Sequence, residues 1–397
     1  MDKRLIISAF FLFTLFTSCV EPFEIKTTSF ESALVVEATL TNELKNQTVK
    51  ISRTFRLEES GVIPEKDATV QIIDDQNNTY LFAENIPGIY TSLVQFEAVL
   101  GRNYQLSIKT KDNRSYISNQ QKINSVSPIN NLKVEAKTYT KAGVQKEGIV
   151  ITAESYDSNK NANYYRYEYE ETYKITATLW SPDELKIIRE WPPLVKVVRR
   201  VNDNRICYKT DFSNEIIQTE TTSLSEDRVS FPVKFIDKND FKIRNRYSLL
   251  VKQYIQSLEA YNYYKILSEI SSSESLFSQM QPGTLIGNIM STDDRNENVL
   301  GFFEVTSLST KRIFFNHSDF YLHDLPPHIE SCTYIAPDLI FQGSSPLVDN
   351  LISNKYIYFS ANPRTQEFLT GPFLLVPKSC GDCTVLGSNV KPSFWID

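Results

Sequence analysis

The sequence lacks an excess of positive charge, and it lacks the motifs of the common enzyme classes. Its 397 residues include 42 Lys and Arg against 48 Asp and Glu, a formal net charge of −6. Nucleic-acid binding needs a concentrated basic face, so nucleic acid is not an expected partner. The GxSxG elbow, the P-loop, the GxGxxG fingerprint and a catalytic Cys–His signature are all absent, which favours a function without catalysis.

Histidine is rare as well. The chain has three, His317, His323 and His328, and Asp319 and Asp324 lie among them. Imidazole and carboxylate groups are common metal ligands, so these histidines are the candidates for a metal site. The segment has no regular pattern that would fix ligand geometry and no HExxH motif, so a solvated loop without metal is the favoured interpretation. No cofactor is expected.

Long apolar runs are missing except at the start of the chain. Residues 5–16 are apolar; Lys3 and Arg4 precede them, and small residues ending in Ser18 lead to Cys19. This run is too short to span a hydrocarbon core of ~30 Å. The pattern is typical of a lipoprotein export signal, so residues 1–18 are expected to be removed and Cys19 lipidated. The alternatives for residues 5–16 are a buried hairpin strand and an uncleaved membrane anchor.

Lipidation of Cys19 would hold the mature chain at a membrane, because two or more acyl chains anchor a protein stably. Residues 19–31 are expected to form a tether. Glu21 and Glu24 follow the cysteine closely, and this resembles the surface-export signals of Bacteroidota lipoproteins. The expected location is therefore the outer membrane, with the protein exposed on the cell surface.

Four cysteines follow Cys19. They are Cys207, Cys332, Cys380 and Cys383. An even number in an exported chain favours disulfides, with the connectivity left open. Cys380 and Cys383 also form a CxxC motif. A four-Cys zinc site usually has two such motifs, and a redox site favours a helix N-terminus after a strand, so zinc and redox chemistry are the alternatives.

The body of the chain has the pattern of a mainly β protein. Residues 32–125 contain segments of period 2, such as Ala68, Val70 and Ile72 alternating with Thr69 and Gln71, and turn signals separate them every roughly 8–12 residues. We therefore predict an N-terminal β-sandwich at 32–125 and a second β-rich domain at 130–397. Both are expected to be antiparallel, immunoglobulin-like or transthyretin-like modules, and the C-terminal segment is loop-rich and contains cysteines.

One helix is predicted, at 257–271. Ser257 is a good N-cap and Glu259 suits the positive end of the helix dipole. The apolar residues that follow share one face at i, i+3, i+4 spacing. They are Ala260, Tyr263, Tyr264, Leu267 and Ile270.

A tyrosine stripe is the candidate binding surface. Tyr165, Tyr167 and Tyr169 fall on one face of a predicted strand, whereas Arg166, Glu168 and Glu170 fall on the other. Exposed aromatic rings can stack on sugars or grip a partner. The favoured alternative is that the stripe is the inward face of a sandwich strand, which makes the Arg166 face a solvated or cross-strand pairing surface.

Adjacent carboxylates do not make a convincing hydrolase site. Glycosidases hold two carboxyl groups across a cleft, but the neighbours Glu170 and Glu171 point to opposite faces of a strand. Asp74-Asp75 and Asp293-Asp294 have the sequence context of turns.

The chain resembles a family of Bacteroidota outer-membrane lipoproteins, the domain of unknown function 4249 family. The residues that carry the resemblance are, in order, Cys19, LVVE at 34–37, PGIYT at 87–91, GRNY at 101–104, YYRYEYEE at 164–171, Cys207-Tyr208, LSEDR at 224–228, Gln253-Tyr254, Ala260-Tyr261, Pro282-Gly283, GNI at 287–289, VLGFF at 299–303, Cys332, Cys380, Cys383 and PSFW at 392–395. Family members tend to have Trp where Tyr167 and Tyr208 stand, and Tyr where Phe302 stands.

The resemblance implies a cellular location and a genomic neighbourhood. The family has no agreed catalytic residues, so none is assigned to this chain. Such lipoproteins tend to be encoded beside TonB-dependent outer-membrane transporters. The expected function is therefore a non-enzymatic binding or accessory module, associated with a β-barrel transporter in nutrient uptake. A structural or assembly lipoprotein on the periplasmic side and a glycan-acting enzyme are the alternatives.

Overall fold

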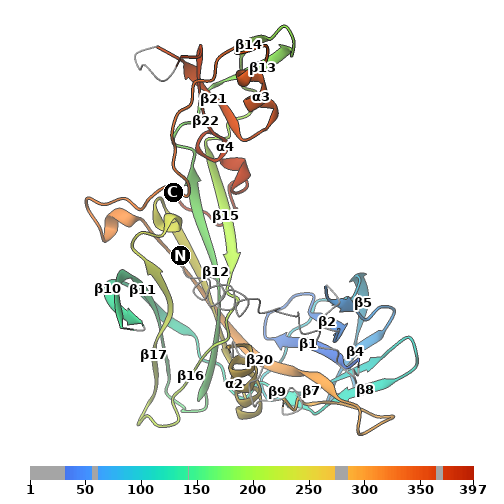
Figure 1. Cartoon of the computed structure of the whole chain (residues 1–397). Helices are drawn as coiled ribbons and strands as arrows, with labels where there is room; N and C mark the ends of the chain where they lie inside the picture. Colours follow the sequence, from blue (N-terminus) through green and yellow to red (C-terminus); the bar gives the residue numbers. More distant parts are fainter. Residues whose placement is uncertain (1–31, 56–60, 142, 273–284, 364–369) are drawn as a thin grey trace, which may run out of the picture.

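The structure, a computed structural model, describes residues 32–55, 61–141, 143–272, 285–363 and 370–397. The predicted signal peptide, the tether and Cys19 lie outside the described residues. Strands dominate the described chain, as the sequence predicts, and two β modules carry a third, smaller module at the far end (Figure 1). None of the described helices is long and apolar enough to cross a bilayer.

The first module is a strongly curved antiparallel sheet around its own core. Its consecutive strands are β1 (Leu34–Thr41), β2 (Thr48–Arg53), β3 (Ile63–Pro64), β4 (Thr69–Asp74), β5 (Thr79–Ile86), β6 (Ile89–Ser92), β7 (Asn103–Lys109), β8 (Ser115–Ser118) and β9 (Gln121–Lys122). Their side chains alternate between buried and partly exposed, as period 2 requires; in β7, Tyr104, Leu106 and Ile108 are the buried set.

Two strands from the second half of the sequence complete this module. They are β19 (Ile289–Ser291) and β20 (Val299–Phe315). β19 pairs with β8, and β20 pairs in parallel with the whole of β1, from Leu34 opposite Val299 onward. The buried Asn288 side chain, directly before β19, links this strand to β20. It donates to the Phe303 carbonyl at 2.9 Å and accepts from the Phe303 N–H at 2.8 Å. The first module is therefore not continuous in sequence.

Gly301 lies at the contact between β1 and β20, and we expect Gly301→Ala to destabilise the protein. Its φ is +136°, and an added methyl group would lie 2.1 Å from the Val36 carbonyl oxygen. Strain at a positive φ costs roughly 1–3 kcal/mol, and the clash adds to it. The matched control is Gly101→Ala, at φ +80° with open space around it. Thermal unfolding should show a clearly larger loss for Gly301→Ala; equal losses would contradict the proposed close contact.

The second module is a sandwich of two sheets. One sheet contains β10 (Ile129–Lys141), β11 (Val144–Asp157) and β17 (Asp227–Asp237). The other contains β12 (Tyr164–Thr176), β15 (Ile206–Phe212), β16 (Ile217–Glu220), β18 (Tyr247–Ile255) and the second half of β20. A single buried cluster fills the space between them, with contributions from both sheets such as Ile151 and Leu249. β20 thus runs through both modules and makes their sheets continuous.

The predicted helix is confirmed as α2 (Leu258–Ser272). The Ser257 hydroxyl accepts from the Ala260 N–H at 3.1 Å, which is the predicted N-cap. Ala260 and Tyr263 pack on Phe302 of β20. The helix therefore lies against the place where the two modules meet (Figure 1).

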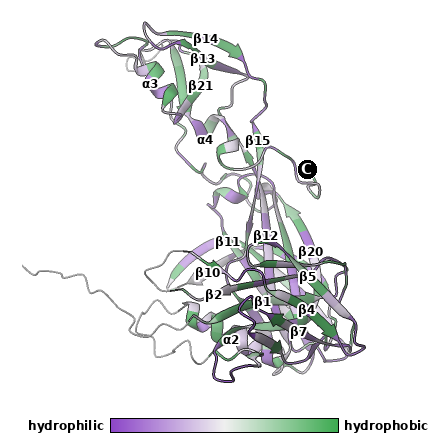
Figure 2. Ribbon diagram, turned by 90° about the vertical axis from the view of Figure 1, so that its right-hand side faces the viewer, coloured by the Kyte–Doolittle hydropathy of each residue, from purple (hydrophilic) through white to green (hydrophobic). Residues whose placement is uncertain are grey.

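The third module stands apart at the end of the molecule, and we call it the distal module. Its elements are β13 (Asp183–Arg189), β14 (Leu194–Arg199), α3 (Pro346–Ile352), β21 (Tyr356–Ala361), β22 (Phe373–Pro377), α4 (Lys378–Gly381) and the 3-10 turn η5 (Cys383–Val385). Leu347, Tyr358 and Leu375 form its small core. Figure 2, turned by 90°, shows the same separation, so the molecule is elongated.

Candidate functional site

A pocket of about 420 Å³ lies where the two β modules and α2 meet, and we call it the junction pocket. Its walls come from β1, β12, β18, β20, α2 and the segment between β15 and β16. Ligand sites in proteins commonly have volumes of about 300–1,000 Å³ and form between structural units. The junction pocket fits both descriptions.

Arg166 is the central polar residue of the junction pocket. It is only 6 % exposed, because α2 covers this face of β12. Its guanidinium donates to Glu304 at 2.9 Å and to Glu168. Of the two expectations for this face, a solvated surface or a cross-strand pairing surface, the second applies to Arg166, which is buried opposite Tyr254 of β18. Glu168, on the same face, is still partly exposed.

Aromatic rings complete the surroundings of this guanidinium. The Tyr254 and Tyr264 rings lie 4.2 and 4.7 Å from it, so it makes two cation–π contacts. Burial acts to lower the pKa of Arg166, but attraction to Glu304, Tyr264 and Glu168 outweighs it and the pKa is raised. Burial also raises the pKa of Tyr254 and of Tyr264. Arg166 stays charged and the two tyrosines stay neutral at all physiological pH values.

Four glutamates and one lysine add further charge to the pocket region. Glu304 sits beneath Arg166 and also accepts from the Gln256 amide at 3.1 Å. Lys252 and Glu170 form an ion pair at 2.5 Å on the wall. Glu37 and Glu215 line the pocket and are exposed. The lining therefore carries more negative than positive charge.

The apolar part of the lining comes from α2 and β20. Tyr263 packs on Phe302 with 5.4 Å between ring centroids, and Leu267 lies beside them. Burial raises the pKa of Tyr263 to about 12. The pocket thus combines aromatic faces with carboxylate acceptors, an arrangement that suits a ligand with hydroxyl or ammonium donors.

The tyrosine stripe faces the interior of the second sandwich. Tyr165 and Tyr167 are buried, and their hydroxyls donate to Asp227 at 2.8 Å and Gln253 at 3.0 Å. Tyr169 is half-buried, and its hydroxyl accepts from the Lys234 ammonium at 2.8 Å. The three tyrosines therefore lie as expected for the inward face of a sandwich strand. Few of their ring atoms are accessible to an external partner.

The three histidines occupy different environments. His317 is buried at the start of the 3-10 turn η4 (His317–Asp319), and burial lowers its pKa. His323 is exposed. His328 is half-buried, with its Nδ1 3.4 Å from the Sγ of Cys332. Among the described residues, the group close enough to share a metal ion is His328, Cys332 and Cys380, and both of these cysteines are in a disulfide.

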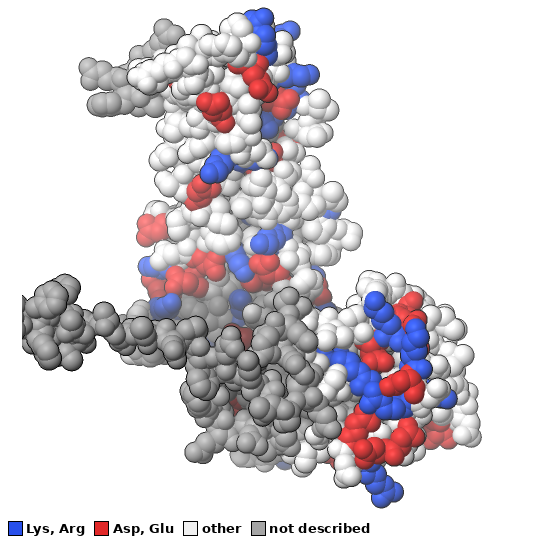
Figure 3. Space-filling view, turned by 45° about the vertical axis from the view of Figure 1, so that its right-hand side comes forward, with Lys and Arg blue, Asp and Glu red and all other residues white. Residues whose placement is uncertain are grey.

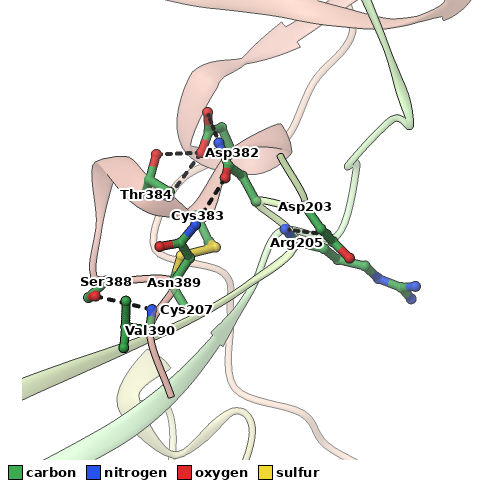
Figure 4. The surroundings of a disulfide bond; sticks show 10 residues. Asp203, Arg205, Cys207, Asp382, Cys383, Thr384, Ser388, Asn389 and Val390 are labelled. Atoms are coloured by element: carbon green, nitrogen blue, oxygen red, sulfur yellow. Dashed lines mark hydrogen bonds between the residues drawn. A yellow bond between two sulfur atoms is a disulfide. The ribbon is translucent and has the colours of Figure 1, made fainter. Parts of the chain in front are cut away.

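The predicted disulfides are confirmed, and they join Cys207 to Cys383 and Cys332 to Cys380. The two CxxC cysteines therefore have different partners. Figure 4 shows the first bridge, between Cys207 and Cys383. The Cys383 N–H donates to the Asn204 carbonyl at 3.0 Å. Asp382 accepts from the Asn204 amide at 3.1 Å. The first bridge fastens η5 of the distal module to β15, and the second fastens α4 to the loop that follows η4. The pairing leaves none of the four thiols free as a metal ligand.

Comparison with known proteins gives a family and no further description. A search of curated proteins found no match. The model of the family described as Domain of unknown function (DUF4249) matches residues 20–312. This range covers most of the chain, including every residue that lines the junction pocket. The chain therefore belongs to the DUF4249 family.

Proposed function

We propose that this protein is a lipoprotein, anchored in the outer membrane through Cys19 and exposed on the cell surface. In this proposal it is a non-enzymatic binding or accessory module of a TonB-dependent β-barrel transporter in nutrient uptake. The observation that carries the proposal is the junction pocket, whose walls come from both β modules and from α2.

The polar groups of the pocket are already held in place, which supports binding as its function. Arg166 is fixed by Glu304, Glu168 and two aromatic rings, and Lys252 is fixed by Glu170. Preorganised groups lose little entropy when a ligand binds. The two disulfides agree with an exported protein, because such bonds persist in oxidising compartments.

Co-purification from the membrane tests the proposal. Cells that carry the tagged protein are solubilised in mild detergent, and the captured complexes are identified by mass spectrometry. We expect a β-barrel transporter in near-equal amount with the wild-type protein. The Cys19→Ser variant, which offers no thiol to a lipid, should leave the membrane fraction and lose the transporter. Recovery of the wild-type protein alone would contradict the accessory role.

Protease treatment of intact cells tests the location separately. Surface exposure predicts that the protein is digested before any periplasmic marker protein. Full protection in intact cells, with digestion after lysis, would instead favour the structural or assembly role on the periplasmic side.

A further inference from the structure

Among the residues that the structure describes, none covers one face and the tip of the hairpin of β13 and β14 at the end of the molecule. The two strands form a sheet of their own. Leu185 and Val195 on one face pack against the distal core. Lys186 and Lys196 point to the other face, as the alternation along each strand requires. Figure 1 places this hairpin far from β1.

The uncovered face carries Lys186 and Lys196, with the exposed Glu184 two residues before Lys186 on the same face. Lys186 and Lys196 lie directly opposite each other in the register, and like charges in that position destabilise a strand pair. Both are exposed, and neither forms an ion pair with any carboxylate of the described chain. Near the turn, Arg189 uses its Nε to donate to the Pro192 carbonyl at 2.9 Å. At this end of the molecule, Lys and Arg side chains lie among Asp and Glu side chains (Figure 3).

Large apolar side chains lie between these lysines and the tip. Ile188 is 53 % exposed, Leu194 is 47 % exposed and Trp191, in the turn, is 55 % exposed. A strand rises about 3.3 Å per residue, so the lysine pair lies about 7 Å behind Ile188 and Leu194. From the tip inward, the order is therefore aromatic, aliphatic and cationic.

We infer that this hairpin contacts an anionic membrane surface. Trp191, Ile188 and Leu194 enter the boundary between headgroups and acyl chains, while Lys186 and Lys196 meet the lipid phosphates. Interfacial elements bury their apolar side by about 5–10 Å, which agrees with the spacing along the hairpin. Trp and Lys are both typical of membrane interfaces, whereas Lys is depleted in protein–protein interfaces.

The attraction has to be local, because the whole chain carries a net charge of −6. Charges farther away than a Debye length of about 8 Å contribute little at physiological salt. Each basic residue close to an anionic surface strengthens binding roughly five-fold. Removal of both lysine charges is therefore expected to weaken binding about 30-fold.

Vesicle binding by the full mature chain with Cys19→Ser tests the inference without lipid anchor or transporter. We expect the protein to sediment with vesicles of phosphatidylcholine and phosphatidylglycerol in equal parts, and poorly with phosphatidylcholine alone. The double variant K186Q/K196Q should bind the anionic vesicles about 30-fold more weakly. The matched control is K133Q/K137Q on β10, where both lysines are exposed and pair with Glu135; it should bind like the parent.

Tryptophan fluorescence gives an independent readout. Anionic vesicles should shift the emission of Trp191 to the blue, and Trp191→Phe should remove that shift, because Trp395 is buried and Trp180 is half-buried.

K186Q/K196Q should unfold no earlier than the parent, because it relieves a like-charge pair. Unchanged vesicle binding in K186Q/K196Q, or no binding by the parent, overturns the inference. A third outcome also overturns the inference: the parent does not bind vesicles, and the hairpin variants no longer co-purify with the transporter. That result would assign this face to a protein partner.

Discussion

Replacement of Arg166 by Met is expected to lower the free energy of unfolding by about 3–5 kcal/mol, because it leaves a buried carboxylate without its cation. Glu304 is 2 % exposed, and its remaining side-chain partner is the Gln256 amide. Chemical denaturation of Arg166→Met and the parent gives the difference directly. A loss below about 1 kcal/mol would show that the ion pair is not desolvated as the structure has it.

Two further variants separate the ion pair from simple packing. Arg166→Met combined with Glu304→Met removes both charges, and should recover most of the lost stability because an apolar pair can replace a buried ion pair at little cost. Lys252→Met is the matched control: its ion pair with Glu170 is about a quarter exposed, and its loss should cost at most about 1 kcal/mol. A double variant as unstable as Arg166→Met would refute the charge argument.

Loss of the Cys207–Cys383 bridge is expected to destabilise the protein by roughly 2–5 kcal/mol. The bridge joins residues 176 positions apart, whereas Cys332–Cys380 spans 48. The entropy removed from the unfolded chain grows with loop length, so Cys207→Ser combined with Cys383→Ser should cost about 1 kcal/mol more than Cys332→Ser combined with Cys380→Ser.

Thiol titration accompanies this measurement. In a Cys19→Ser background, the native protein should show no reactive thiol before reduction, because all four remaining cysteines are paired. Two or more reactive thiols in the native protein, or equal stability of both double-serine variants and the parent, would contradict the pairing.

Local patterns predicted the local structure well. The N-cap at Ser257 and the apolar spacing from Ala260 predicted α2 within a residue at each end, because capping and i, i+4 contacts depend only on nearby residues. Alternation likewise predicted β4, where Val70 and Ile72 are buried. The presence of disulfides followed from the number of cysteines, whereas their pairing depends on which strands and turns meet in space.

The core of the junction pocket could not be predicted in the same way. Alternation assigns side chains to two faces of a strand, but it does not say how far each face of β12 is covered, and so it left a solvated surface and a cross-strand pairing surface as alternatives for Arg166. The pairing of β1 with β20 is parallel and spans most of the sequence, which no local pattern reveals. One signal was available: Glu304 stands between Phe303 and Val305 in an apolar run, where a charge needs a buried partner.

The pairing of β1 with β20 also decides when the chain can finish folding. Leu34 pairs with Val299, so 265 residues must leave the ribosome after Leu34 before its partner exists. Until then β1 presents one unpaired edge of backbone N–H and C=O groups, which is a template for aggregation. We therefore expect the growing chain to be a chaperone client, and a truncated chain that ends before β20 to aggregate instead of yielding a folded first module.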